Sequence, residues 1–176
     1  MTPPRLALAR RKARDLLANN HVKAPSVPVV EFARKLGAII RYEPFAGEQL
    51  AGVLYQPLNG SPIIGVNSLD SGPRQRFTIA HELGHLLLHP REEIHVDANF
   101  VLAFRNQKSS TASDVREIEA NQFAAELLVP LAFLEHDLRQ MKIDLESSED
   151  IAGLADRYGV SKQAMTIRLS TLARLS

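Results

Sequence analysis

The sequence predicts an α+β protein with several helices, a small sheet of about three strands, and a pair of helices at the C-terminus. Three observations lead to this fold class. Residues 5–18 and 24–38 carry apolar side chains at helical spacing. Residues 38–67 instead hold short runs rich in β-branched and aromatic side chains, which are typical of strands. Helical spacing returns after residue 70 and, apart from one irregular interval, continues to the end of the chain.

The composition suits a chain of one domain, or one domain with a small appendage, that folds by itself. Among 176 residues, 45% are hydrophobic, and the formal net charge of +1 does not indicate a nucleic-acid or acidic membrane partner. The absence of cysteine excludes disulfides and thiolate metal sites and is typical of a reducing compartment. No apolar run is long enough for a signal peptide or a membrane span. We therefore expect a cytoplasmic protein without membrane contact.

Two helices are expected before the sheet. Residues 5–18 place apolar side chains on one face and basic side chains on the other, which we interpret as a solvated face. In the second helix, Ser26 is the expected N-cap, Pro28 falls at an early position, and Gly37 ends the helix.

Three strands are expected over residues 38–44, 50–57 and 62–67. Asn59-Gly60, between the last two, is the usual signal for a tight hairpin turn. Pro57 and Pro62 flank this turn and cannot donate ladder hydrogen bonds, so at least one of these strands should lie at a sheet edge. Such an edge, near residues 49–67, can bind an extended peptide. A further strand is expected at residues 99–104.

The segment RFTIAHELGHLLLHP, residues 76–90, places polar groups in an otherwise apolar helix. His81 and His85 are four residues apart, so their side chains project from one helix face, as two ligands of one ion require. Glu82 lies beside that face and can reach a metal-bound water. Gly84 lets another backbone approach between the ligands. The pattern predicts a catalytic metal site; the alternative is a hydrogen-bonded pair of core histidines with Glu82 in solvent.

A catalytic zinc takes three protein ligands and keeps one position for water. A third histidine at position 91, as in metzincins, is excluded because Arg91 stands there. The remaining arrangement takes a glutamate from a second helix, and the segment EIEANQFAAELLVP, residues 117–130, offers Glu117 and Glu119.

Helix geometry separates these two glutamates. Glu117 shares its face with the small residues Ala120 and Ala124, whereas Glu119 lies with Glu126 on a polar stripe. Glu117 is therefore the expected metal ligand, although it could be an ordinary surface acid in a first helical turn. Asn121, one turn after Glu117, is expected to accept the outer N–H of a ligand histidine.

Taken together and in this order, the two segments resemble the ImmA/IrrE family of metallopeptidases. The likeness covers roughly residues 25–135. It implies a zincin-like core that holds one Zn²⁺ between the two motif helices, although Mn²⁺ can occupy similar ligands. It also implies that His81, His85 and Glu117 are the metal ligands and that Glu82 is the general base.

The resemblance implies a zinc-dependent endopeptidase that cleaves a specific protein substrate, a helix-turn-helix transcriptional repressor. We expect a zincin-like metallopeptidase domain over residues 1–135 and a C-terminal helical segment over residues 136–176 packed on it. The sequence does not identify the hydrogen-bond donor that stabilises the oxyanion. The candidates are Tyr55, His89, His95, Arg105 and Tyr158. His89 is expected at the helix end and not as a ligand.

The first alternative function is a DNA-binding regulator. Gly159 lies at the turn of a segment with helix-turn-helix spacing, and Ser161 is the expected N-cap of its second helix. That second helix offers only Lys162 and Arg168 as cations, which is few for phosphate affinity. Direct nucleic-acid binding is therefore not expected, and we interpret the segment as a structural helical pair.

The second alternative is a metal-bound, antitoxin-like interaction module without turnover. Glu82 argues against it, because a structural metal site needs its ligands but has no use for a base beside them.

Overall fold

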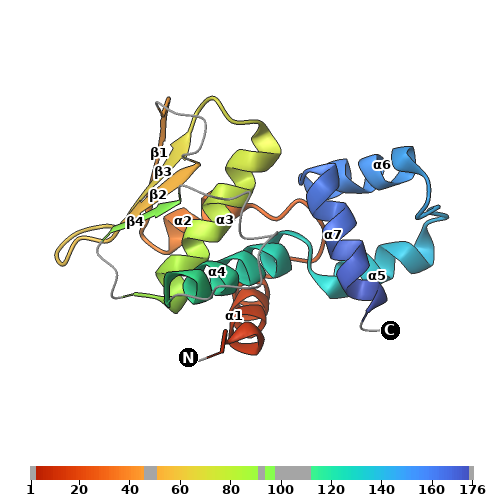
Figure 1. Cartoon of the computed structure of the whole chain (residues 1–176), viewed down its shortest axis with the longest axis horizontal. Coiled ribbons are helices and arrows are strands. Elements are labelled where there is room, and N and C mark those ends of the chain that lie inside the picture. Colours follow the sequence, from red (N-terminus) through yellow and green to blue (C-terminus); the bar gives the residue numbers. More distant parts are fainter. Residues whose placement is uncertain (1–2, 46–50, 91–93, 98–111, 175–176) are drawn as a thin grey trace.

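The computed structural model describes residues 3–45, 51–90, 94–97 and 112–174. It confirms the α+β class, and Figure 1 shows the sheet and α3 on one side of the molecule and the C-terminal helices on the other. In chain order the elements are α1 (Leu6–Asn19), α2 (Val29–Lys35), β1 (Ile39–Glu43), β2 (Gly52–Tyr55), β3 (Ile63–Asn67), α3 (Gly72–Leu88), β4 (Ile94–Asp97), α4 (Ala112–Leu128), α5 (Leu131–Gln140), α6 (Ser148–Tyr158) and α7 (Lys162–Ala173).

The described strands form one sheet in the order β1-β3-β2-β4. β1 runs parallel to β3, whereas β2 runs antiparallel to both β3 and β4. The antiparallel pairing of β2 with β3 is confirmed, but the two strands are joined by residues 56–62, so the prediction of a tight turn at Asn59-Gly60 was wrong. β4 was not predicted from the sequence, and the strand expected at residues 99–104 lies outside the described residues.

The prediction that a strand flanking the hairpin lies at a sheet edge was wrong. β2 and β3 are both central, and β1 and β4 are the edges of the described sheet. The ladder between β2 and β3 ends at the pair Tyr55 and Ile63. Pro57 and Pro62 lie beyond this pair, so the missing N–H groups cost the sheet no hydrogen bond.

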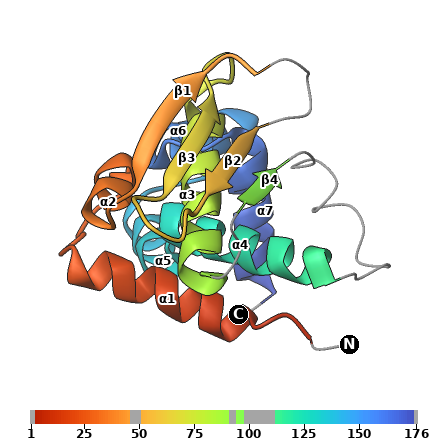
Figure 2. The same cartoon turned by 90° about the vertical axis from the view of Figure 1, so that its left-hand side faces the viewer.

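One face of the sheet packs on α3. Leu54, Ile64 and Val66 are fully buried on this face, and Figure 2 shows the strands in front of α3, with α1 at the bottom of the view. α3 lies between the sheet and α4, and its side chains meet apolar neighbours in nearly every direction. This position explains why the helix is apolar almost all round.

α1 packs along α4 through the small buried residues Ala9 and Ala13. At α2 the expected N-cap was wrong: Ser26 lies outside the helix with φ +66°, and Pro28 occupies the N-cap position. Ser26 in this conformation turns the chain before the helix begins. Gly37 has φ +80° and follows the helix directly, which confirms the predicted stop.

The C-terminal helical pair is confirmed as α6 and α7. Gly159 takes a left-handed conformation after α6, and the Ser161 hydroxyl caps α7 by accepting a hydrogen bond from the Ala164 backbone. Arg76 of α3 donates hydrogen bonds to the carbonyls of Gly159 and Val27, which ties this turn to the core. The predicted division after residue 135 falls inside α5, a helix that the sequence reading missed.

Candidate metal centre

The helix α3 buries three polar side chains in its central turns. It begins after Ser71, with Pro73 in its first turn, and His81, Glu82 and His85 are each at most 1% exposed. A buried polar group without a partner costs about 2 kcal/mol or more, so the fold must supply partners for all three.

His81, His85 and Glu117 form one cluster between α3 and α4. The two imidazole Nε2 atoms are 3.0 Å apart. The Glu117 carboxylate lies 3.2 Å from His81 Nε2 and 3.3 Å from His85 Nε2. Two ligands bound at about 2.0–2.1 Å with tetrahedral angles stand about 3.3 Å apart, so this spacing fits one small cation. The donor set of two histidines and one glutamate is also that of catalytic zinc sites.

The electrostatics of the cluster favour an anionic Glu117. Desolvation raises the pKa of this carboxyl group, but the hydrogen bonds and charges of His81 and His85 outweigh it, so the pKa falls well below its usual range. The Glu117 side chain is 26% exposed, whereas both histidines are buried. Solvent therefore reaches the cluster from the side of α4, where Glu117 lies.

Asn121 lies behind His81, as the sequence predicted. Its side-chain oxygen is 3.0 Å from His81 Nδ1. Because an amide oxygen can only accept, Nδ1 carries a proton. In the neutral imidazole this leaves the lone pair on Nε2, the nitrogen that faces His85 and Glu117. This tautomer is the one that metal binding through Nε2 requires.

Glu82 lies beside the histidine face of α3, on the flank of the helix that packs against the sheet. A β-carbon built at Gly52 of β2 would lie 2.8 Å from Glu82 Oε1 and 2.4 Å from Thr78 Cγ2. The backbone of β2 therefore passes close to the Glu82 carboxylate, and only a glycine leaves room for it. The histidines point toward α4 while the adjacent glutamate points toward β2.

Residues 33–170 match the family described as the IrrE N-terminal-like domain, Peptidase_M78. The chain belongs to this family. The resemblance noted in the sequence is thereby confirmed, and the match takes in all the elements of the metal centre but leaves α1 and the start of α2 outside.

Two further proteins are similar to this chain, one in sequence and one in fold. Over 67 residues the chain is 37% identical to "Uncharacterized immunity region protein 2" of Bacillus phage phi105, a match that covers 38% of this chain and 37% of the phage protein. The fold is similar to that of a Mycobacterium tuberculosis transcriptional regulator, with a TM-score of 0.61 and 18% identity over 92% of this chain. The chain spans less than half the length of either protein, 46% in the case of the regulator.

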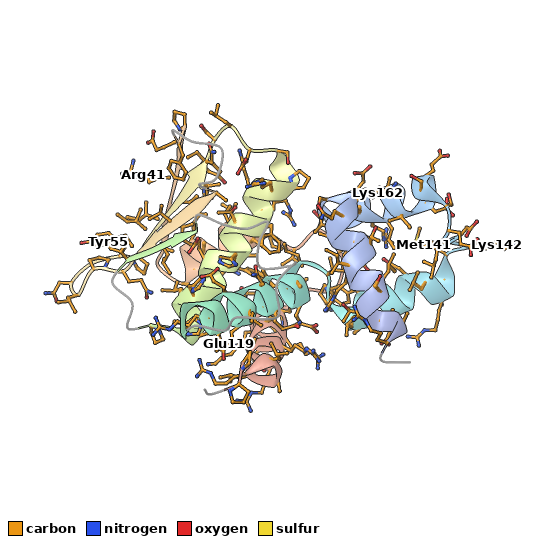
Figure 3. All side chains as sticks on the ribbon, in the orientation of Figure 1. Arg41, Tyr55, Glu119, Met141, Lys142 and Lys162 are labelled. Atoms are coloured by element: carbon orange, nitrogen blue, oxygen red, sulfur yellow. The ribbon has the colours of Figure 1, made fainter. Side chains whose placement is uncertain are left out.

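In this IrrE-like chain the polar stripe of α4 packs against α1, whose basic face we interpreted from the sequence as solvated. Glu119 and Glu126 are each 1% exposed. Glu119 accepts hydrogen bonds from the Arg5 backbone N–H at 2.6 Å and from the Arg5 guanidinium at 2.8–3.2 Å. Figure 3 shows Glu119 where α4 passes α1. The basic face of α1 is therefore partly an ion-pairing surface for α4, and sequence spacing alone could not pair the two helices.

Among the remaining candidate residues, His89 lies next to the cluster, with its ring centroid 5.4 Å from that of His85. The others lie apart from the cluster or outside the described residues. His89, at the end of α3, is buried, and its Nε2 lies 3.6 Å from Glu119; desolvation lowers its pKa. Tyr158 is buried in α6, where its hydroxyl donates to Asp137. Tyr55 is an exposed residue of β2. Arg105 and the side chain of His95 lie outside the described part of the chain.

No helix in the described part of the chain is long and apolar enough to cross a membrane.

Proposed function

We propose that this chain is a zinc-dependent endopeptidase that cleaves a helix-turn-helix transcriptional repressor in the cytoplasm. The observation that carries the proposal is the convergence of two imidazole nitrogens and one carboxylate, at mutual distances of 3.0–3.3 Å, next to a buried glutamate that has no place in a purely structural site. Membership of a peptidase family and the phage immunity-region relative support the same activity and the same kind of target.

Each residue of the centre has a distinct task in this proposal. His81, His85 and Glu117 hold the ion, and Asn121 keeps His81 in the tautomer that binds through Nε2. When bound, Zn²⁺ would supply a water with a pKa of about 7 and a Lewis acid for the scissile carbonyl. Glu82 would be the general base of the site, which accepts a proton and returns it to the leaving amine. Mn²⁺ remains the alternative ion for these ligands.

The substrate would bind as an extended strand at a sheet edge. The edge expected from the sequence, at residues 49–67, is occupied, because β2 pairs with β4 and with β3. We therefore assign this task to β4, which pairs only with β2 among the described strands and lies next to the strand that contacts Glu82. Backbone pairing of this kind is poorly selective by sequence.

We retain the proposed division into a peptidase domain, residues 1–135, and a C-terminal helical segment, residues 136–176, that packs on it. Arg168 of α7 is 4% exposed and donates to the Val129 carbonyl and to Glu126. A buried, paired arginine does not contact DNA phosphates, so α7 keeps only Lys162 of the two cations counted in the sequence. This observation favours the structural role of the helical pair over direct nucleic-acid binding.

Metal content tests the centre first. We expect about one equivalent of zinc in the wild-type protein purified without an affinity tag, measured by mass spectrometry, and its loss in Glu117→Gln. Glu135→Gln is the matched control, because it makes the same change at an exposed glutamate of α5. Wild-type protein that takes up neither zinc nor manganese when they are supplied would refute the proposal.

Turnover is tested separately with Glu82→Gln. This variant should retain its metal but leave the repressor intact in cells, and the new N-termini produced by the wild type identify the substrate. Cleavage by both proteins, or metal loss in Glu82→Gln, would contradict the role of Glu82. Tight metal binding by a wild type that generates no new N-termini would instead favour the interaction module without turnover.

A further inference from the structure

A cavity of about 340 Å³ lies between α4 and α7, with Leu6 of α1 among its lining residues. Its walls are mostly apolar, and Leu128, Val160 and Ile167 contribute to them. None of the clustered residues His81, His85 and Glu117 lines it. The volume falls in the range of roughly 300–1,000 Å³ that is usual for small-molecule sites.

Two residues that line this cavity also contact His81 of the metal centre. Phe77 and Asn121 both line it. The Phe77 ring stacks on the His81 ring with centroids 6.2 Å apart, and Asn121 accepts the hydrogen bond from His81 Nδ1. A molecule in the cavity would therefore contact the two side chains that set the orientation of His81.

The lining residues of the cavity include two arginines and no acidic residue. Arg168 and Arg174 line it, and Arg168 is paired with Glu126, which also binds Arg14. Desolvation lowers the pKa of Arg168, the charge and hydrogen bond of Glu126 raise it, and repulsion by Arg10 and Arg14 lowers it, so that the pKa lies below its usual value. The buried Nε of Arg10 has no hydrogen-bond partner among the described residues. The Glu126 carboxylate thus faces more guanidinium groups than it can neutralise.

We propose that this cavity is an effector site for a small amphipathic anion, an apolar chain that ends in a carboxylate, whose binding changes the affinity of the neighbouring metal centre. The apolar walls would bury the chain, and the arginines would attract the charged end. This site goes beyond the proposed peptidase activity. Its binding can be measured on the full-length protein without any substrate.

Decanoate is the probe, and decylamine, of equal chain length and opposite charge, is the matched control. We expect saturable decanoate binding below about 1 mM by isothermal titration calorimetry, and clearly weaker binding of decylamine. Octanoate should bind about tenfold more weakly than decanoate, because it buries two fewer methylene groups. Equal binding of decanoate and decylamine, or no saturation, would overturn the proposal.

Three variants locate the site. Ala164→Leu fills the cavity from α7 and should abolish binding, since Ala164 lines it. Arg174→Gln changes an exposed residue that lines the cavity and should weaken binding about threefold to fivefold while the fold stays intact. Lys162→Gln removes a cation at the other end of the same helix (Figure 3) and should leave the affinity unchanged. An equal effect of the two charge variants would refute a specific anion site.

The effect of the anion on metal affinity rests on the proposed metal site, and it is measured separately from binding of the anion. Zinc affinity, determined by competition with a chelator, should change severalfold when decanoate is saturating, and decanoate affinity should change by the same factor when zinc is bound. Binding of decanoate without this reciprocal change would leave an anion site but refute its effector role. If the chain binds no zinc, the calorimetry still tests the anion site.

Discussion

Gly84 of α3 lies directly against the backbone of Ala120 of α4. A β-carbon at residue 84 would stand 3.0 Å from the Ala120 Cα and 3.1 Å from its carbonyl oxygen. Gly84 lies between His81 and His85 along the chain, and Ala120 lies close to one helical turn after Glu117. This contact therefore brings the two helices together at the height of the cluster, and it sets how far the carboxylate stands from the imidazoles.

We expect Gly84→Ala to weaken metal binding and to destabilise the fold. The added methyl group must push the backbone of α4 away, which costs about 1–3 kcal/mol and moves Glu117 away from the histidines. Zinc content and urea denaturation measure the two effects. Gly153→Ala is the control, because no atom lies within 4 Å of a β-carbon built there. It should stabilise α6 by up to about 1 kcal/mol. Full zinc occupancy in Gly84→Ala would contradict this account of the contact.

Gly52→Ala should separate catalysis from metal binding. Its β-carbon would overlap Thr78 and press on the Glu82 carboxylate, whereas His81 and His85 contact Glu117 of α4. We expect zinc to be retained and cleavage of the identified substrate to fall at least about tenfold, since a general base contributes about 10²–10⁴ to the rate. Gly72→Ala, where nothing lies within 4 Å, is the control. Equal activity of the two variants would show that Gly52 does not position Glu82.

Arg5→Ala should lower the free energy of unfolding by about 1–3 kcal/mol, because it leaves the buried Glu119 carboxylate without its guanidinium partner. The comparison is Lys12→Ala, an exposed cation of the same helix, which should change stability by less than about 0.5 kcal/mol. Chemical denaturation measures the free energy of unfolding of both variants. If their effects are equal, the ion pair between α1 and α4 contributes nothing measurable.

The Asp137 carboxylate predicts a defined pH dependence of stability. Hydrogen bonds from Arg157 and then from Tyr158 outweigh desolvation and hold the pKa of Asp137 below its ordinary value of 3.8. A lowered folded pKa means that the ionised group stabilises the fold above the unfolded pKa, and that this contribution is lost as the pH falls through the folded pKa.

Asp137→Asn should therefore be less stable than the wild type by about 1–3 kcal/mol near neutral pH, and the difference should shrink on acidification below about pH 4. Thermal unfolding across this pH range measures it. Asp156→Asn, at an exposed position of α6, should follow the wild-type pH profile. A difference between wild type and Asp137→Asn that is constant with pH would exclude the linkage.

The elements that local patterns determine were predictable. The four-residue spacing of His81 and His85 places them on one face of any helix. Gly159 marks the end of one helix, and Ser161 is the N-cap of the next. Glu117 could be separated from Glu119 by its helix face alone. These inferences need only the period of a helix, which every short segment carries in itself.

The errors came from contacts between distant segments. Pro57 and Pro62 could not reveal that β4 would cover β2, because strand order depends on which edge a later segment reaches. The basic face of α1 was interpreted as solvated because Glu119 and Glu126, the partners of Arg5 and Arg14, are more than 110 residues away in the chain.

The sequence by itself determined the classes of its segments and the chemistry of the motif helix, because side-chain type and helical period are local properties. Only the tertiary structure decided that Gly84 meets Ala120, that Gly52 makes room for Glu82, and that Arg168 is buried against Glu126. These contacts follow from how whole helices and strands pack together, and packing minimises buried voids and unpaired charges over the entire chain at once.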